Sequence, residues 1–209
     1  MLSVSKLSAQ RADRLLFSGL SFALHAGQCL HLRGANGAGK TTLLKILAGL
    51  STAQDGEISW QGRPLAKWGD DYYGMLHYLG HKDGLKDLLS PLANLRIAAD
   101  LSGQALSEAA ALKTLAQAGL IRQSDLAVRV LSQGQKKRAA LARLLAISRP
   151  LWLLDEPFVA LDQAAQKQLG EWISRHNHDG GIVILTSHQA LPDAIQNVIE
   201  LNLSAGCSV

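Results

Sequence analysis

A glycine-rich segment in the first quarter of the chain has the residue types that hold phosphate. Its spacing matches G-x-x-x-x-G-K-[ST], and its members are Gly34, Ala35, Asn36, Gly37, Ala38, Gly39, Lys40 and Thr41. Glycines let backbone N–H groups turn inward around phosphate oxygens, and Lys40 adds a positive charge for the β and γ oxygens. Thr41 offers a hydroxyl to Mg²⁺, and Thr42 follows it in the loop. The segment therefore predicts a site for ATP and Mg²⁺.

Two adjacent acids, Asp155 and Glu156, follow an apolar stretch much later in the chain. If that stretch is a strand of an open α/β sheet, both acids lie at the carboxyl edge, where such sheets bind ligands. Asp155 suits Mg²⁺, either directly or through water. Glu156 is the candidate that polarises the attacking water, because hydrolysis needs a proton acceptor opposite the γ-phosphate.

The segment LSQGQ, which contains Ser132, Gln133, Gly134 and Gln135, comes just before a long helical pattern. Ser132 and Gln135 have the spacing of a capping box, in which each side chain bonds the backbone of the other residue. Ser132 and the amides near Gly134 would also present donors and a helix N-terminus to an anion. Taken alone, the segment is equally consistent with a plain helix start.

Four short apolar stretches are predicted to be strands of a parallel sheet that positions these groups. They are Cys29 to Leu32, Met75 to Leu79, Leu151 to Leu154 and Ile182 to Leu185. Helical patterns alternate with them, such as TTLLKILAGL after the first and QKKRAALARLLAI before the third. This alternation is typical of an α/β fold.

A single domain is expected over residues 1–209. Residues 1–81 and 132–209 are predicted to form a nucleotide-binding core, with a small antiparallel layer from the first 25 residues. Residues 82–131 are predicted to form an inserted helical subdomain, whose clearest amphipathic segment is Leu106 to Leu120.

Composition excludes several classes of protein. Hydrophobic residues make up 47% and charged residues 18%, which excludes a disordered chain. A net charge of +4 is a mild excess, and 5% aromatic residues give little support to a platform for stacking bases, so no nucleic-acid partner is expected. Cys29 and Cys207 lack metal or haem spacing and are expected to be reduced thiols. Neither a secretory signal nor a run of ~18 apolar residues is present, so a cytoplasmic chain is expected.

Together, these motifs carry a family resemblance. LSQGQ resembles the LSGGQ signature of ABC ATPases, and its position before LLDEP, with the phosphate loop upstream, is similar to the order in that family. The resemblance covers nearly the whole chain. It implies a phosphate-loop NTPase core with a parallel sheet, a small antiparallel β layer and an inserted helical subdomain. It also implies a homodimer, in which the signature of one chain closes over the ATP of the other.

Further roles follow from the resemblance alone. Asp162, in Ala160-Leu161-Asp162, resembles the D-loop residue that contacts the opposite subunit, and His188 resembles the switch histidine that contacts the γ-phosphate. Two positions depart from the usual pattern. His81 stands where most members have the Q-loop glutamine, and Arg11 stands where many stack a tyrosine on adenine. For both residues a plain surface role stays open.

The chain also has a narrower resemblance, to the ATP-binding subunits of bacterial haem exporters of cytochrome c maturation. This resemblance rests on the short length, the segment LGHKDGLK, the signature and the lack of a C-terminal regulatory extension. That resemblance implies a polytopic membrane partner and a peripheral place on the cytoplasmic face of the bacterial inner membrane. The alternatives are an ATPase subunit of another small transporter and a soluble ABC protein acting on ribosomes or DNA. Tandem domains or coiled-coil insertions would favour the soluble protein, and the sequence has neither. A scaffold without turnover is disfavoured by Glu156.

Overall fold

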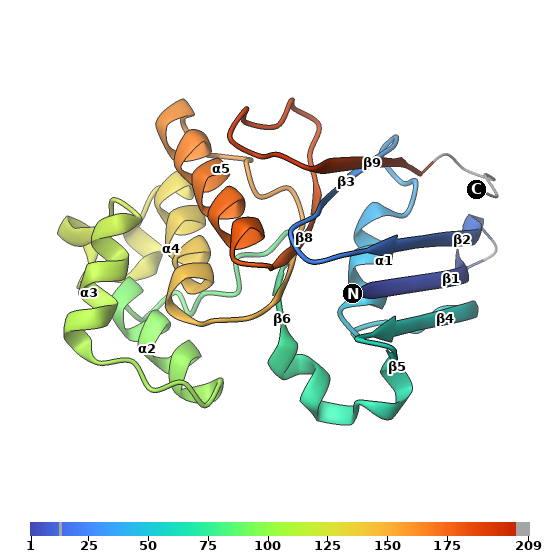
Figure 1. The fold of residues 1–209 in the computed structure, drawn as a ribbon. Helices are drawn as coiled ribbons and strands as arrows, with labels where there is room; N and C mark the ends of the chain where they lie inside the picture. The colour runs from blue at the N-terminus through green and yellow to red at the C-terminus, as the bar shows by residue number, and fades with distance from the viewer. Residues whose placement is uncertain (13, 204–209) are drawn as a thin grey trace.

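A five-stranded parallel sheet lies at the centre of the computed structural model, which describes residues 1–12 and 14–203 (Figure 1). Its strands in spatial order are β6 (Leu76–Leu79), β7 (Leu151–Leu154), β8 (Ile182–Thr186), β3 (Cys29–Arg33) and β9 (Val198–Asn202). The four predicted strands are confirmed to within one residue at each end. β9 was not predicted, because it is a half-exposed edge strand that lacks a continuous apolar run.

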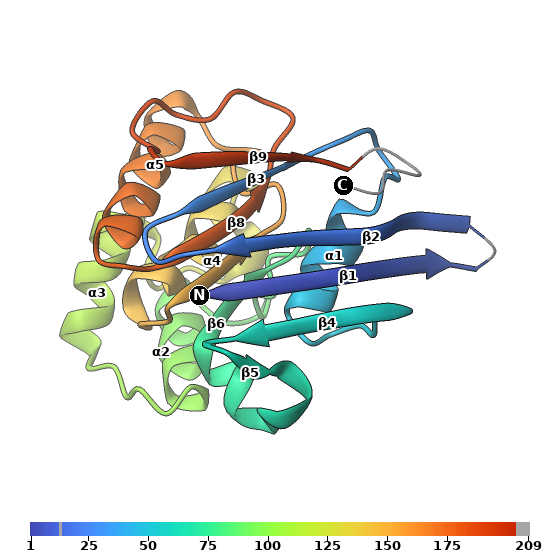
Figure 2. The ribbon, with the colours of Figure 1, turned by 45° about the vertical axis from the view of Figure 1, so that its right-hand side comes forward.

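A four-stranded antiparallel sheet covers one side of the molecule (Figure 2). Its order is β2-β1-β4-β5, from β2 (Arg14–Leu24), β1 (Leu2–Arg11), β4 (Asp55–Trp60) and β5 (Arg63–Pro64). The predicted layer of the first 25 residues is therefore present, and two later strands extend it. Gly56 is required in β4, because an added Cβ would lie 2.5 Å from the backbone of Leu7.

The three inner strands of the central sheet, β7, β8 and β3, are buried on both faces, and their alternate residues separate two cores. Leu30, Leu153 and Ile184 point toward α1 (Lys40–Leu47) and the antiparallel sheet. Trp152 and Val183 belong instead to a core shared with α4 (Gln133–Ala146) and α5 (Gln163–His178). Each strand thereby ends at an edge held rigidly from both sides.

The helical part of the chain contains α2 (Pro91–Leu101) and α3 (Glu108–Gln117), which pack against α4. α3 is shorter than the predicted segment, because the Ser107 hydroxyl caps its start. The two faces of α4 differ: Ala139 and Ala142 pack in the helical core, and Leu141 packs against the sheet. α4 is thus the element that joins the two parts. Short 3₁₀ turns η1 (Leu65–Lys67), η2 (Gly69–Met75), η3 (Ile121–Gln123) and η4 (Val128–Val130) complete the connections.

No helix in the described parts of the chain is both long and apolar enough to cross a membrane. Cys29 is a free, buried cysteine, and burial raises the pKa of its thiol to about 12. Cys207 lies outside the described residues.

Candidate nucleotide-binding site

The glycine-rich segment forms the turn between β3 and α1, the context that a phosphate loop requires. Gly39 precedes the first residue of α1 with φ of +103°, a conformation that L side chains rarely adopt. The first turn of α1 contains no acidic residue, and no side chain caps the helix. Its free N–H groups and the positive end of its dipole are therefore available to an anion.

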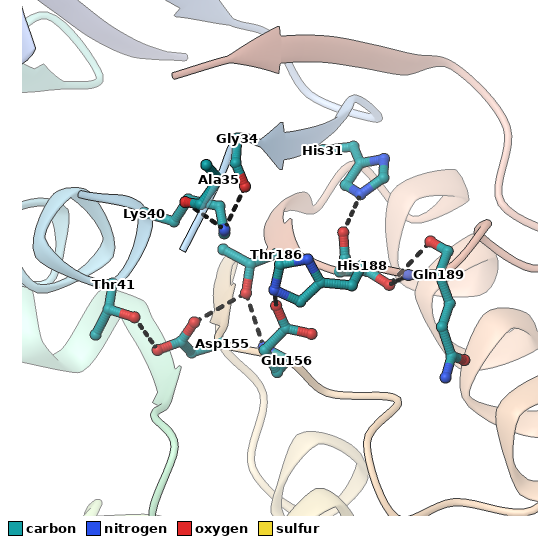
Figure 3. Close-up of polar contacts among 11 residues, drawn as sticks. His31, Gly34, Ala35, Lys40, Thr41, Asp155, Glu156, Thr186, His188 and Gln189 are labelled. Carbon is teal, nitrogen blue, oxygen red and sulfur yellow. Dashed lines mark hydrogen bonds and ion pairs between the residues drawn. The ribbon is translucent and has the colours of Figure 1, made fainter. Parts of the chain in front are cut away.

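Lys40, the first residue of α1, is folded back over the loop (Figure 3). Its Nζ donates to the carbonyl oxygens of Gly34 at 2.7 Å and of Ala35 at 3.3 Å. The ammonium group is thus held above the turn of the loop, where a bound polyphosphate would meet it.

Asp155 is the centre of a hydrogen-bond network at the carboxyl edge of the sheet (Figure 3). Its Oδ2 accepts a 2.8 Å hydrogen bond from Thr41 Oγ1, and its Oδ1 accepts one of 2.8 Å from Thr186 Oγ1. The Asp155 N–H donates to the Leu79 carbonyl at 2.7 Å. Asp155 is 3% exposed, its bond to Thr186 is buried, and the two bonds together fix both carboxylate oxygens.

Glu156 has a backbone φ of +48°, which is strained for a residue with a side chain. Its N–H donates to Thr186 Oγ1 at 2.8 Å, and this bond helps to hold the strained turn. His188 Nε2 lies 3.4 Å from Glu156 Oε1, with side chains 55% and 20% exposed. A contact of such exposure adds little stability.

These residues line a cavity of about 520 Å³. It is bounded by Arg11, Leu16, Asn36, Gly37, Gly39, Lys40, Thr41, Thr42, His81, Asp155, Glu156, Val159 and His188. The structure thus brings together both acids, most of the loop and the two positions that depart from the family pattern, whereas Gly34, Ala35 and Ala38 are outside this lining. A cavity of about 580 Å³ lies elsewhere, between β4 and η2, but its charged lining residues, Glu57 and Asp70, repel phosphate.

The signature residues Ser132 to Gln135 do not line the 520 Å³ cavity that contains the phosphate loop and both acids. The predicted capping box is confirmed: Gln135 N–H donates to Ser132 Oγ at 3.2 Å, and Ser132 N–H donates to Gln135 Oε1 at 2.9 Å. Gly134 packs against the segment before α5, since an added Cβ would lie 2.7 Å from the Ala160 carbonyl oxygen. Asp162 caps α5 by accepting from Ala165 N–H at 2.8 Å.

Sequence reasoning missed several residues of the site. Thr186 joins both acids, and its place directly before Ser187 and His188 at a strand end was the available signal. Leu16 and Val159 form apolar walls that motif reasoning did not address. His31 was also missed: its Nε2 lies 3.2 Å from the Ser187 carbonyl oxygen, beside the loop that carries His188.

Fold and site together define the class of this protein: a phosphate-loop ATPase subunit with an antiparallel layer and a helical insertion. A family model described as ABC transporter matches residues 17–159. The cytochrome c biogenesis ATP-binding export protein CcmA of Dechloromonas aromatica is 49% identical over 203 residues, 97% of this chain and 100% of that protein. Its namesake in Escherichia coli O157:H7 is 45% identical, over 98% of this chain and 97% of that protein.

Solved structures agree with this class. An ATP binding subunit of an ABC transporter is 29% identical, with a TM-score of 0.78 over 90% of this chain and 80% of that chain. A dimeric bacterial ABC transporter cassette shares the fold at 22% identity, with a TM-score of 0.84 over 99% and 96%. The chain belongs to the ABC transporter family and, within it, to the cytochrome c biogenesis ATP-binding export proteins. It is therefore an ATPase, and the recognition made from the motifs is confirmed.

Proposed function

We propose that this chain is the ATP-hydrolysing subunit of an inner-membrane transporter that serves c-type cytochrome biogenesis. Its work would be haem delivery toward the periplasm or release of a haem-loaded chaperone there. The relatives support the pathway, because CcmA proteins from several bacteria are 43% to 49% identical over more than 90% of the chain. The network that joins Asp155 to Thr41 and Thr186 is the observation that carries the ATPase assignment.

ATP would bind with its phosphates in the loop from Gly34 to Thr42. Backbone N–H groups at the start of α1 and the ammonium of Lys40 supply the donors and positive charge for the phosphate oxygens. Arg11 lines the same cavity and would lie against the base, where its planar guanidinium can stack.

We infer that the site also binds Mg²⁺. Thr41 Oγ1 and Asp155 Oδ2 lie 2.8 Å apart, and hydroxyl and carboxylate oxygens are the donors that Mg²⁺ prefers together with substrate phosphates. Thr41 and Asp155 would hold the ion, which when bound neutralises charge on the transferred phosphoryl group.

Glu156, His188, Lys40 and His81 are the residues that would carry out hydrolysis. Glu156 would accept a proton from the attacking water, since its carboxylate faces the cavity beside Asp155. His188 would hold the Glu156 carboxylate and contact the γ-phosphate, and Lys40 would stabilise the developing charge. His81 lines the same cavity and would take the place of the Q-loop glutamine, supporting the ion or its water.

Two copies of the chain would complete each site. Ser132, Gln133, Gly134 and Gln135 lie outside the cavity of their own chain, and the start of α4 that they form would face a nucleotide bound by a second copy. Asp162, next to Ala160 and Gly134, would contact the opposite subunit at that boundary. A dimer of this kind would sit on the cytoplasmic face of a polytopic membrane subunit.

The test is purification of the tagged chain from detergent-extracted bacterial membranes, followed by identification of the copurifying subunit. We expect a polytopic membrane protein, ATPase activity in the complex, and loss of holocytochrome c when the gene is deleted. If the purified complex hydrolyses ATP but the deletion strain makes normal amounts of holocytochrome c, the chain belongs to a different transporter. A complex that contains no ATPase activity would refute the catalytic assignment.

A further inference from the structure

Lys137 is a buried lysine in α4 whose charge the proposed mechanism does not use. It is 6% exposed, and its Nζ lies 3.8 Å from Asp83 Oδ1. Burial lowers the pKa of Lys137, and the negative charges of Asp83, Asp155 and Glu156 oppose that shift. The ammonium group therefore sits in the field of the loop after β6 and of both acids of the nucleotide cavity.

The loop that contains Asp83 follows His81, and α4 and α2 hold it in place. Arg143, also on α4, donates from Nη2 to the Asp83 carbonyl oxygen at 2.7 Å. The Asn94 side chain on α2 accepts from Lys86 N–H at 2.7 Å and donates to the Lys86 carbonyl at 3.1 Å. The Asp83 side chain thus pairs with Lys137 and its backbone carbonyl accepts from Arg143, both on α4.

That helix begins with the signature. Lys137 lies one turn after Gly134. The lysine that contacts the loop after His81 is therefore on the same helix as the signature residues, which would face a second copy of the chain. Asp83 and His81 are only two residues apart in an irregular segment. The contact of Asp83 with Lys137 therefore joins the loop at the cavity to the second turn of α4.

Stability does not explain a charge at this position. A buried ion pair replaced by apolar side chains of similar volume is often neutral or more stable, because the desolvation of two charges offsets their attraction. Leu141 and Leu144, further along α4, show that this helix also packs apolar side chains against the sheet.

We propose that Lys137 is a positioning residue for ATP hydrolysis, which fixes the His81 loop relative to the signature helix. It acts through Asp83 and does not touch the nucleotide. This inference rests on the assignment of the nucleotide cavity, and it adds a route by which that cavity and the signature of the same chain move together.

The test uses the full chain in complex with its membrane subunit. Lys137→Met removes the charge and keeps the length, Lys137→Arg keeps the charge, and Lys113→Gln, an exposed lysine on α3, is the matched control. We expect Lys137→Met to lower kcat at least tenfold with KM within about twofold and the melting temperature of the complex near wild type. Lys137→Arg should recover most of kcat, and Lys113→Gln should match wild type.

Asp83→Asn tests the same contact from its other side, so the test remains possible if Lys137→Met does not fold. It should lower kcat as well, and the double variant should be no worse than Lys137→Met alone, because the two residues act as a pair. Wild-type kcat in Lys137→Met or in Asp83→Asn would overturn the proposal, as would a loss of kcat that Lys137→Arg does not restore. If the wild-type complex itself hydrolyses no ATP, the proposed function fails before this inference is reached.

Discussion

The hydroxyl of Thr186 donates a 2.8 Å hydrogen bond to Asp155 Oδ1 and accepts one of 2.8 Å from the N–H of Glu156. The strands that carry these residues are neighbours, with Leu154 paired to Leu185. One buried hydroxyl therefore sets both the carboxylate that faces Thr41 and the backbone turn that aims Glu156.

Replacement of Thr186 by Val tests this relationship, because it removes the hydroxyl and keeps the shape. We expect kcat to fall roughly tenfold to a hundredfold, the effect of losing hydrogen bonds to a buried charged group. Thr186→Ser keeps the hydroxyl and should stay within a fewfold of wild type. The steady-state ATPase rates of both variants are the measurement, and equal rates for Val and Ser would contradict the assigned role.

Lys40→Ala should abolish productive ATP binding. Its ammonium is the main positive charge held over the loop, so we expect nucleotide affinity to fall roughly a hundredfold or more. Titration calorimetry with a non-hydrolysed ATP analogue measures the loss. Lys45→Gln, on the exposed last turn of the same helix, is the control. Unchanged ATPase activity in Lys40→Ala would remove the phosphate site from this loop.

Glu156→Gln should keep ATP affinity and nearly stop hydrolysis, by roughly 10²- to 10⁴-fold, because the amide keeps the shape but cannot accept the proton. The trapped state should be a dimer by size exclusion in the presence of MgATP. Glu171→Gln, an exposed glutamate on α5, is the matched control. A Glu156→Gln protein that stays monomeric with MgATP, even with its membrane subunit, would refute the composite site.

Two substitutions of His81 test whether this residue acts in the nucleotide site or is an ordinary surface residue. If its side chain supports the ion or its water, His81→Gln should keep much of the ATPase activity and His81→Ala should lose it. The alanine variant should also uncouple hydrolysis from cytochrome c maturation. ATPase rate and holocytochrome yield are the two readouts, and wild-type values for His81→Ala in both would leave the residue with no role.

Stability should fall on mild acidification because of two partly buried histidines. Burial lowers the pKa of His77 and of His176 to about 4, and an unfolded histidine titrates near 6.5. Between these values the unfolded chain binds protons that the folded chain does not, so the folded state is favoured above pH 6.5 and loses stability as pH falls. Each histidine should contribute a loss of about 2 kcal/mol or less at pH 5.

Thermal unfolding between pH 7 and pH 5 measures this effect. His77→Gln should show a shallower loss than wild type, whereas His178→Gln, at the exposed end of α5, should follow the wild-type curve. Equal slopes in all three proteins would show that His77 takes no part in the acid sensitivity.

Local patterns predicted much of this fold, because buried parallel strands are short apolar runs and the phosphate loop has a fixed spacing. Leu151 to Leu154 and the loop around Lys40 are of this kind. β9 and β4 escaped prediction, since their alternation is weak and their partners lie far away in the chain. The contact of Lys137 with Asp83 depends on how α4 crosses the loop after β6, which no local pattern encodes.

The position of β3 between β8 and β9 bears on how the protein is made. β3 precedes the phosphate loop, yet both of its neighbours come from residues 182–202. A nascent chain synthesised at about 5–20 residues per second would carry this apolar strand unpaired for roughly 10–30 s. The nucleotide site is therefore encoded early and assembled late, because β3, which leads into the phosphate loop, gains its neighbours only after residues 182–202 have been made.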